Sequence, residues 1–250
     1  MFCTVNIKNQ EYNCFYKTNE KKDLPPLVIL HGWGVDSSIF DNIINELNYY
    51  VIVIDFIGFG KSDQPNVAFS LEDYVNQIDQ IIKKLKLKHI TLLGHSFGGR
   101  VAIKYNYYYN LDNLILVDSA GIRHRSMSLY KKIIKYKFLK KVYFIFNKEK
   151  YNELINNSGS RDYKILNPIM KQTMNKVIRV DLKKYCMSTR TNTFLLWGKN
   201  DNETPISDAF VLYKTFYQSR LIVFYRSGHF PHLDEPEKFI KLVNRVIKDG

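Results

Sequence analysis

Short apolar runs that alternate with helical patterns constrain the fold of this chain more than any other feature. Four runs lie in the first half of the chain and two near its end: Leu27–Leu30, Val51–Ile54, Ile90–Leu93, Leu114–Val117, Phe194–Gly198 and Leu221–Tyr225. Strands that are apolar along nearly their whole length are buried on both faces, as in parallel sheets. The sequence therefore predicts an α/β fold in which helices cover a parallel sheet on both sides.

The remaining segments fit around this sheet. At the start, residues 2–8 and 11–17 alternate in polarity, which predicts an antiparallel hairpin. Residues 122–185 are rich in Lys, Tyr, Phe and Asn, show helical periodicity and contain no apolar strand run. We therefore expect one core made of residues 1–121 and 186–250, interrupted by a helical insertion at 122–185.

Two helices between the first strands can be placed from their starting signals. Ser37 or Ser38 is expected to cap a helix that continues through Leu47. Further on, the sequence Ser70-Leu71-Glu72-Asp73 resembles a capping box. The helix after it extends to Leu85 and carries its apolar residues on one face.

The segment Gly94-His95-Ser96-Phe97-Gly98-Gly99 follows one of the apolar runs and precedes a helical pattern. A strand that turns into a helix around Gly-x-Ser-x-Gly is the context of a nucleophile elbow. The turn is so tight that the residues two before and two after the serine crowd each other and must be glycine. We therefore predict that Ser96 is a nucleophile and that the backbone N–H of Phe97 points toward a developing oxyanion.

A serine nucleophile needs a base and an acid that orients the base. In open parallel sheets, active groups lie at the carboxyl ends of strands. This rule selects His229 as the base, with His232 as its rival, and Asp201 as the acid, with Asp118 and then Glu203 as alternatives. The order Ser96, Asp201, His229 is that of one hydrolase class and differs from the chymotrypsin and subtilisin orders.

The turn His31-Gly32-Trp33-Gly34 follows the first apolar run. Its flanking glycines allow the backbone N–H of Trp33 to approach a substrate oxygen, so we predict Trp33 as the second oxyanion donor. Trp197, in contrast, is expected to be a core residue. The triplet at 60–62 resembles the end of a phosphate-binding loop, but the required first glycine is replaced by Asp55. With no dinucleotide motif and no metal-ligand spacing, we expect no cofactor and no metal.

The chain carries 37 Lys and Arg against 24 Asp and Glu, a formal net charge of +13. Such a charge suits a nucleic acid or an acidic membrane surface. The lysines are scattered among Asn, Ile and Tyr, however, a bias that fits genome composition, so we expect no nucleic-acid partner. The basic aromatic run 130–141 leaves membrane contact open. We favour instead a helix with its apolar side on the cleft and its lysines in solvent.

The compartment is inferred from segments that the sequence lacks. No apolar run approaches the roughly 18 residues that span a membrane. The first residues form no charged region followed by an apolar one, as a secretory signal would. Cys3, Cys14 and Cys186 show no metal spacing, which favours reduced thiols in the cytoplasm. A bridge between Cys3 and Cys14 across the hairpin stays open as an alternative.

Taken together, these motifs resemble those of the α/β-hydrolase superfamily over essentially the full length of the chain. The matching segments are His31–Gly34, Asp55–Ser62, Gly94–Gly99, Trp197–Asp201, Gly228-His229 and Pro231–Phe239. The resemblance implies an eight-stranded, mostly parallel sheet with a helical cap inserted after the sixth strand. It also implies that residues 55–62 form a structural turn near the cleft.

On this basis we expect a carboxylesterase-like serine hydrolase that cleaves an apolar ester or a related acyl substrate through an acyl-enzyme. Serine at position 96, rather than aspartate, argues against the branches that use a carboxylate nucleophile, such as epoxide hydrolases and haloalkane dehalogenases. Two alternatives remain. One is the hydrolysis of a carbon–carbon bond in a diketone-like substrate, and the other is a ligand sensor with very slow turnover.

Overall fold

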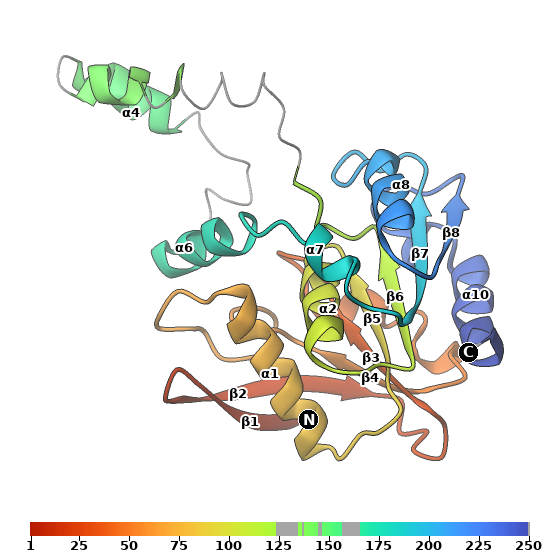
Figure 1. Ribbon diagram of the computed structural model, residues 1–250. Helices are drawn as coiled ribbons and strands as arrows, with labels where there is room; N and C mark the ends of the chain where they lie inside the picture. The colour runs from red at the N-terminus through yellow and green to blue at the C-terminus, as the bar shows by residue number, and fades with distance from the viewer. Residues whose placement is uncertain (124–134, 137, 145–146, 157–165, 250) are drawn as a thin grey trace.

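The computed structural model describes residues 1–123, 135–136, 138–144, 147–156 and 166–249. Its centre is one eight-stranded sheet with the strand order β1-β2-β4-β3-β5-β6-β7-β8 (Figure 1). The strands are β1 (Phe2–Ile7), β2 (Gln10–Thr18), β3 (Pro26–Leu30), β4 (Tyr50–Ile54), β5 (Thr91–His95), β6 (Asn113–Val117), β7 (Asn192–Gly198) and β8 (Ser219–Phe224). Strand β2 runs antiparallel to β1 and β4, and all other neighbours are parallel. The predicted eight-stranded, mostly parallel sheet is confirmed.

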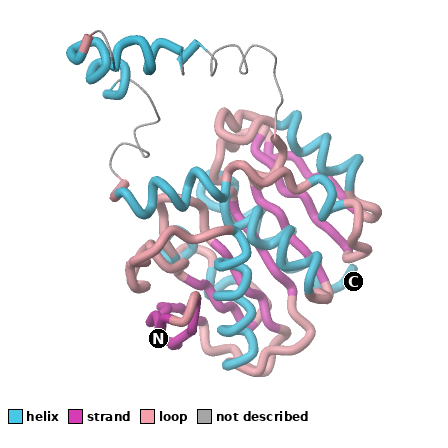
Figure 2. The backbone as a smooth tube through the Cα atoms, turned by 60° about the vertical axis from the view of Figure 1, so that its left-hand side comes forward, coloured by secondary structure: helices cyan, strands magenta, loops and turns pink. Residues whose placement is uncertain are grey.

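Alternate residues of each central strand enter two separate cores, one on each face of the sheet. In β3, Val28 and Leu30 pack into one core, and Leu27 and Ile29 pack into the other. The first core also receives α1 (Leu71–Lys84), α2 (Phe97–Tyr108) and α8 (Ile206–Thr215). The second receives α10 (Pro236–Asp249). Figure 2 shows the strands side by side among these helices. Burial on both faces explains why the strand sequences are apolar throughout.

The predicted helix from Ser37 or Ser38 through Leu47 is wrong. The structure has two short 3₁₀ helices here, η1 (Ser37–Phe40) and η2 (Ile44–Glu46), and the cap of η1 is Asp36. The backbone makes i→i+3 hydrogen bonds here, from the Asp41 N–H to the Ser38 carbonyl at 3.1 Å and from the Ile43 N–H to the Phe40 carbonyl at 3.0 Å. Asn19 and Lys21 bind the carbonyl oxygens of Ile44 and Leu47, at 3.1 and 3.2 Å.

The predicted capping box opens α1. The Ser70 hydroxyl accepts a hydrogen bond from the Asp73 N–H, and the Asp73 carboxylate accepts one from the Ser70 N–H. This reciprocal pair satisfies two N–H groups that have no partner inside the helix. Helix α1 begins, as expected, at residue 71.

The described part of the segment between β6 and β7 consists of helices joined by loops. Its helices include α4 (Lys148–Asn156), α6 (Pro168–Val177) and α7 (Lys183–Cys186). Figure 1 shows α4 at the upper left, apart from the sheet. Residues 130–134 and 137, half of the basic aromatic run 130–141, lie outside the described residues. The membrane contact left open for this run and the favoured cleft-facing helix therefore both stay untested.

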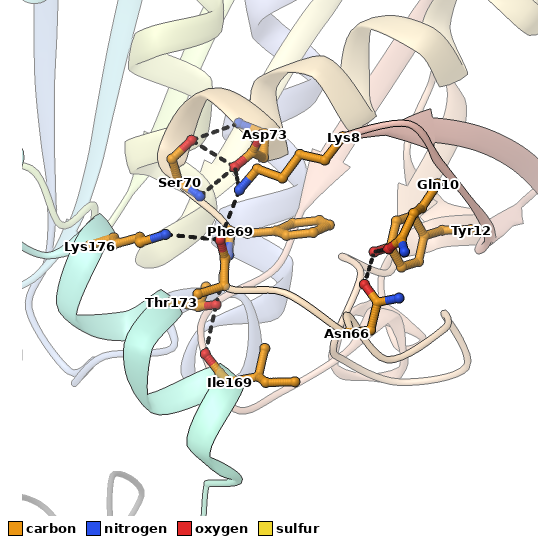
Figure 3. Close-up of polar contacts among 11 residues, drawn as sticks. Lys8, Gln10, Tyr12, Asn66, Phe69, Ser70, Asp73, Ile169, Thr173 and Lys176 are labelled. Carbon is orange, nitrogen blue, oxygen red and sulfur yellow. Dashed lines mark hydrogen bonds and ion pairs between the residues drawn. The ribbon is translucent and has the colours of Figure 1, made fainter.

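Helix α6 is bound to the loop that precedes α1. Thr173 accepts a hydrogen bond from the Phe69 N–H at 3.0 Å, and its own hydroxyl donates to the Ile169 carbonyl one turn earlier (Figure 3). Lys176 and Lys8 both donate to the carbonyl oxygen of Ala68, at 3.1 and 2.8 Å. The inserted segment is thus fixed to the core at this helix.

A second attachment joins the end of α6 to α2. The buried guanidinium of Arg100, on α2, donates to the carbonyl oxygens of Val177 and Val180. The last carbonyls of a helix have no intrahelical partner, so a cation at this end is favourable. Burial lowers the pKa of Arg100 to about 10. This residue ties the inserted segment to the helix that follows Ser96.

The cysteines are free thiols. Cys3 and Cys14 are directly opposite in the register of the β1–β2 hairpin, yet no bridge joins them. Burial raises the pKa of the Cys14 thiol to about 12, and the pKa of Cys186 is raised to a similar value for the same reason. Among the described helices, none combines the length and the apolar character required to cross a bilayer.

Candidate active site

Ser96 occupies a strained turn between β5 and α2. Its backbone has φ 51° and ψ −112°, a conformation that residues with a side chain rarely adopt. Three hydrogen bonds hold it there. The Ser96 N–H donates to Val117 at 3.0 Å, and the Ser96 carbonyl accepts from the N–H groups of Gly99 and Ala120, each at 3.1 Å. The surrounding backbone therefore fixes the serine at the carboxyl edge of the sheet.

Glycines surround this turn because the backbone passes too closely for side chains. A Cβ atom on Gly94 would lie 2.5 Å from the Gly98 carbonyl oxygen, and one on Gly98 would lie 2.2 Å from that of Leu30. A Cβ atom on Gly99 would lie 2.0 Å from the hydroxyl of Ser119. The predicted crowding between Gly94 and Gly98 is therefore present, and the end of β3 adds to it.

His229 and Asp201 meet across the ends of β8 and β7. The His229 Nδ1 atom lies 2.8 Å from Asp201 Oδ2, and the Asp201 side chain is completely buried. Among the described residues, Ser96 Oγ makes no hydrogen bond, to His229 or to any other group. Such a gap is common where the substrate is absent, because these bonds tighten when it binds.

Asp201 is held as a carboxylate by several donors. Besides His229, it accepts hydrogen bonds from the N–H of Glu203 at 2.7 Å, from the N–H of Thr204 at 3.0 Å and from the Thr204 hydroxyl at 2.6 Å. Burial alone would raise its pKa, but the hydrogen bonds from His229 and Thr204 outweigh burial and lower the pKa below its usual value. An ionised carboxylate can accept a hydrogen bond from the imidazole Nδ1–H and stabilise the charged form of the ring without taking up its proton.

The alternative base, His232, and the alternative acid, Glu203, lie in different environments. His232 is fully buried and stacks on Phe40 with a ring-centroid distance of 4.6 Å. Neither of its ring nitrogens has a hydrogen-bond partner among the described residues, and burial lowers its pKa to about 3. The side chain of Glu203 is exposed, and only its backbone contacts Asp201. The geometry therefore favours His229 and Asp201.

Asp118, the other alternative acid, lies beside the pair rather than in it. One carboxylate oxygen accepts a hydrogen bond from the Gly198 N–H at 2.9 Å. Donor and acceptor atoms of Asp118, Asp201 and His229 all lie within 4.8 Å of one another. Burial, followed by the contact with Asp201, raises the pKa of Asp118 to about 9. The side chain of Asp118 thus binds the backbone at the end of β7.

The predicted oxyanion donors flank Ser96. Phe97 is the first residue of α2, where the N–H has no acceptor inside the helix. Trp33 lies in the loop after β3, and a Cβ atom on its neighbour Gly32 would be 3.3 Å from the Cβ of Ser96. His31 holds this loop, since one ring nitrogen contacts the Gly32 carbonyl at 2.7 Å and the other accepts from the Phe56 N–H at 3.0 Å.

Aromatic rings cluster beside the nucleophile turn. The indole of Trp33 packs edge-on against Phe59 at 4.8 Å and against Phe97 at 5.2 Å. Phe97 also contacts Phe56 at 5.1 Å and Tyr74 at 5.2 Å. Apart from the partly buried Trp33, the rings of this cluster are buried in the core next to Ser96.

Two residues of this region were not singled out from the sequence. His95 is buried beside Ser96, and its Nε2 atom contacts the His229 carbonyl oxygen at 2.8 Å, which fixes the loop of the proposed base. Thr204 donates hydrogen bonds from its N–H and its hydroxyl to Asp201, the proposed acid. A signal for Thr204 does exist, because a hydroxyl residue three positions after Asp201 can return a hydrogen bond to the carboxylate. No local sequence pattern indicates the contact of His95 with the His229 carbonyl oxygen.

Comparison with known proteins is consistent with this geometry. A family model described as the alpha/beta hydrolase fold matches residues 25–131. The AB hydrolase superfamily protein YisY of Bacillus subtilis is 25% identical over 240 residues, which cover 87% of this chain and 90% of that protein. The pimeloyl-[acyl-carrier protein] methyl ester esterase of Wigglesworthia glossinidia brevipalpis is 26% identical over 246 residues, with 89% and 93% covered.

A solved structure gives the same result over the whole chain. An esterase from Exiguobacterium antarcticum superposes with a TM-score of 0.72 at 25% sequence identity. The superposition covers 99% of this chain and 100% of that one. Together with the strand order and the strained turn at Ser96, these similarities identify the family: the chain belongs to the α/β-hydrolase superfamily.

Proposed function

We propose that this protein is a serine hydrolase that cleaves a carboxylic ester or a related acyl substrate through an acyl-enzyme. The observation that carries the proposal is the 2.8 Å contact between His229 Nδ1 and buried Asp201, at the same sheet edge as the strained turn of Ser96. A base oriented by an acid, next to a serine exposed on a tight turn, is the arrangement that nucleophilic acyl transfer requires.

In the first half of the reaction, Ser96 Oγ attacks the substrate carbonyl carbon while its proton passes to His229 Nε2. The bond to the carbonyl oxygen loses its double-bond character, and the resulting oxyanion accepts hydrogen bonds from the N–H groups of Trp33 and Phe97. Asp201 keeps the His229 ring oriented and stabilises its positive charge. The leaving alcohol takes the proton from His229, and the acyl group stays on Ser96.

In the second half, water attacks the acyl-enzyme. His229 accepts the proton of this water, the same N–H groups bind the second oxyanion, and the carboxylic acid leaves as Ser96 regains its proton. The aromatic cluster of Trp33, Phe59 and Phe97 beside the nucleophile turn supports the assignment of an apolar substrate group. We further propose that residues 122–185 act as the cap over this site, with α6 as their fixed base.

The test is labelling with a fluorophosphonate, which reacts with an activated serine. Wild-type protein, Ser96→Ala and His229→Ala are compared, with His89→Ala as the matched histidine control, because the His89 side chain is 85% exposed. We expect labelling of the wild type and of His89→Ala only, and hydrolysis of short or long acyl esters by these two proteins. Full ester hydrolysis by Ser96→Ala would contradict the proposal.

Other outcomes separate the alternatives. Cleavage of a diketone in preference to every ester would place the activity in carbon–carbon bond hydrolysis. Labelling of Ser96 without measurable turnover of any substrate would favour a ligand sensor, and a ligand-dependent rise in thermal stability would then be expected.

A further inference from the structure

Asp118 is a buried carboxyl group that the proposed reaction does not use. It is the first residue after β6, its side chain is fully buried, and its backbone has a positive φ of 41°. Such a conformation is costly for a residue with a side chain and persists where surrounding contacts enforce it. A hydrogen bond contributes to this here: the Asp118 N–H donates to the Leu196 carbonyl oxygen at 3.0 Å.

The two oxygens of this carboxyl group have different surroundings. Oδ1 accepts the hydrogen bond from the Gly198 N–H at 2.9 Å. Oδ2 is buried and receives no donor from any residue in the described part of the chain. A buried carboxylate with only one donor is strongly disfavoured, because it has lost the hydration that stabilises its charge. The group should therefore carry a proton on Oδ2.

Asp201 supplies the acceptor for that proton. Both side chains belong to the cluster whose donor and acceptor atoms lie within 4.8 Å of one another, and their interaction raises the pKa of Asp118 and lowers that of Asp201. When two carboxyl groups share a buried site, one of them retains a proton. Asp201 is fixed as the anion by four hydrogen bonds, from His229, Glu203 and twice from Thr204.

The other charged groups around Asp118 act in the same direction. After burial, the hydrogen bond with Asp201 does most to raise the pKa of Asp118, the Gly198 N–H opposes it, and the negative charges of Asp201 and Asp234 raise it further. The neighbouring His229 uses its Nδ1 atom for Asp201 and so offers Asp118 no donor from that atom. The protonated form of Asp118 is thus favoured by burial, by hydrogen bonding and by repulsion.

We infer that Asp118 is a neutral carboxylic acid that donates a hydrogen bond from Oδ2 to Asp201, and that it positions Asp201 toward His229. The positioning role rests on the proposed hydrolase function. Asp118 does not touch the reacting atoms. Its part is to add one more hydrogen-bond donor to the Asp201 carboxylate. An ionised Asp118 could not supply this donor, because two carboxylates have no proton to share.

The same three side chains could also be considered as ligands of a metal ion. However, the His229 Nδ1 atom faces Asp201 Oδ2 at hydrogen-bond distance, and a nitrogen that donates a proton has no lone pair for a metal. The short contact is therefore better explained by a chain of hydrogen bonds from Asp118 to Asp201 to His229.

Two variants of Asp118 separate hydrogen bonding from charge. In Asp118→Asn the amide oxygen can still accept from Gly198 and the amide N–H₂ can still donate to Asp201, with no proton to lose. In Asp118→Leu the size is similar and both contacts are lost. We expect kcat of the Asn variant to stay within about threefold of wild type and kcat of the Leu variant to fall about tenfold or more, with KM little changed in both.

Equal loss in the Asn and Leu variants would overturn the inference, because the neutral hydrogen-bond donor would then not be the property that matters. Restoration of kcat by the Asn variant relative to the Leu variant would support it. A purely structural effect of residue 118 would lower the amount of folded protein, and measurement of kcat per labelled active site corrects for this.

Infrared spectroscopy tests the proton directly and does not depend on turnover. We expect a carboxylic acid C=O band at neutral pH in the wild type that is absent in Asp118→Asn and disappears as the pH rises through about 9. Absence of this band in the wild type would overturn the inference and leave the hydrolase proposal standing. If the band is present but fluorophosphonate labelling fails, the proton on Asp118 is established and the hydrolase proposal is rejected.

Discussion

The indole nitrogen of Trp197 donates a 2.8 Å hydrogen bond to the carbonyl oxygen of Thr204. Trp197 is fully buried near the end of β7, and Thr204 supplies two of the hydrogen bonds that Asp201 accepts. The loop that carries the proposed acid is thus fastened to the core by a side chain that makes no contact with His229. The prediction that Trp197 is a core residue is consistent with this position.

Trp197→Phe should therefore affect both stability and activity. Loss of the indole N–H leaves the buried Thr204 carbonyl without its donor, and the smaller ring leaves a cavity, so the free energy of unfolding should fall by about 2–4 kcal/mol. The value of kcat should fall as well, because the Asp201 loop is held less firmly. Denaturant unfolding and ester hydrolysis measure the two effects.

Trp33→Phe is the matched control for this change. The Trp33 indole nitrogen has no hydrogen-bond partner within the described residues, and the side chain is only partly buried. Its replacement removes no hydrogen bond and should lower the free energy of unfolding by about 1 kcal/mol or less. Equal losses in the two variants would show that the bond between Trp197 and Thr204 contributes nothing.

Gly98→Ala tests the close approach at the nucleophile turn. The added Cβ would lie 2.2 Å from the Leu30 carbonyl oxygen, which belongs to the backbone of β3 and cannot move independently. We expect a loss of about 3 kcal/mol or more in the free energy of unfolding, and loss of fluorophosphonate labelling in any protein that folds. Thermal unfolding and labelling are measured on the same preparations.

Gly228→Ala provides the comparison on the other side of the site. A Cβ atom on Gly228, the neighbour of His229, would meet no atom closer than 3.9 Å, the distance to Asp234 Oδ2. This variant should keep nearly wild-type stability and labelling. If Gly98→Ala were tolerated equally well, the crowding around the turn would not be what requires glycine at position 98.

The parts of this site that could be predicted are those with a local sequence signal. Buried strands can be recognised as apolar runs. The turn at Ser96 requires glycine wherever another backbone segment passes closely, as at Gly98. The selection of Asp201 and His229 used one further rule, that strand ends of a parallel sheet share an edge. Those two side chains are 28 residues apart in the chain and still meet.

The parts that could not be predicted depend on partners far away in the sequence. The contact of His95 with the His229 carbonyl joins residues 134 positions apart. Asn19 and Lys21 bind the carbonyls of Ile44 and Leu47, 25 and 26 residues away, in a segment where the local pattern favoured a helix. The protonation state of Asp118 likewise depends on its burial at the ends of β6 and β7, which no local sequence pattern indicates.

Asp118→Asn should change how stability depends on pH. Burial and then the contact with Asp201 raise the pKa of Asp118 from 3.8 to about 9, so between these values the folded chain keeps a proton that the unfolded chain has released. The stability that this group contributes is full below pH 3.8 and is lost as the pH rises toward about 9. The slope for one proton is at most about 1.4 kcal/mol per pH unit.

The Asn variant carries no such proton. The free energy of unfolding of Asp118→Asn, minus that of the wild type, should therefore increase as the pH rises through this range. Denaturant unfolding at a series of pH values measures it, and Glu203→Gln corrects for the general effect of losing one acid beside the same loop. A difference that decreases with rising pH would mean that Asp118 is ionised in the folded protein.

Arg100→Met tests the attachment of the inserted segment to α2. The substitution keeps an apolar stem but removes the guanidinium that donates to Val177 and Val180, so two carbonyls at the end of α6 lose their donor. The free energy of unfolding should fall by about 2–4 kcal/mol. Hydrogen exchange should accelerate in peptides that contain α6 more than in those that contain β5, because local opening of this segment becomes easier.

Arg123→Met serves as the control, since Arg123 makes a single 3.4 Å hydrogen bond to the Arg179 carbonyl at an exposed position. It should leave both the stability and the exchange of α6 nearly unchanged, as expected for an exposed bond that water can replace. If exchange in α6 were the same in the two variants, Arg100 would not hold this helix. The bond between Thr173 and Phe69 would then have to hold α6 on the core without it.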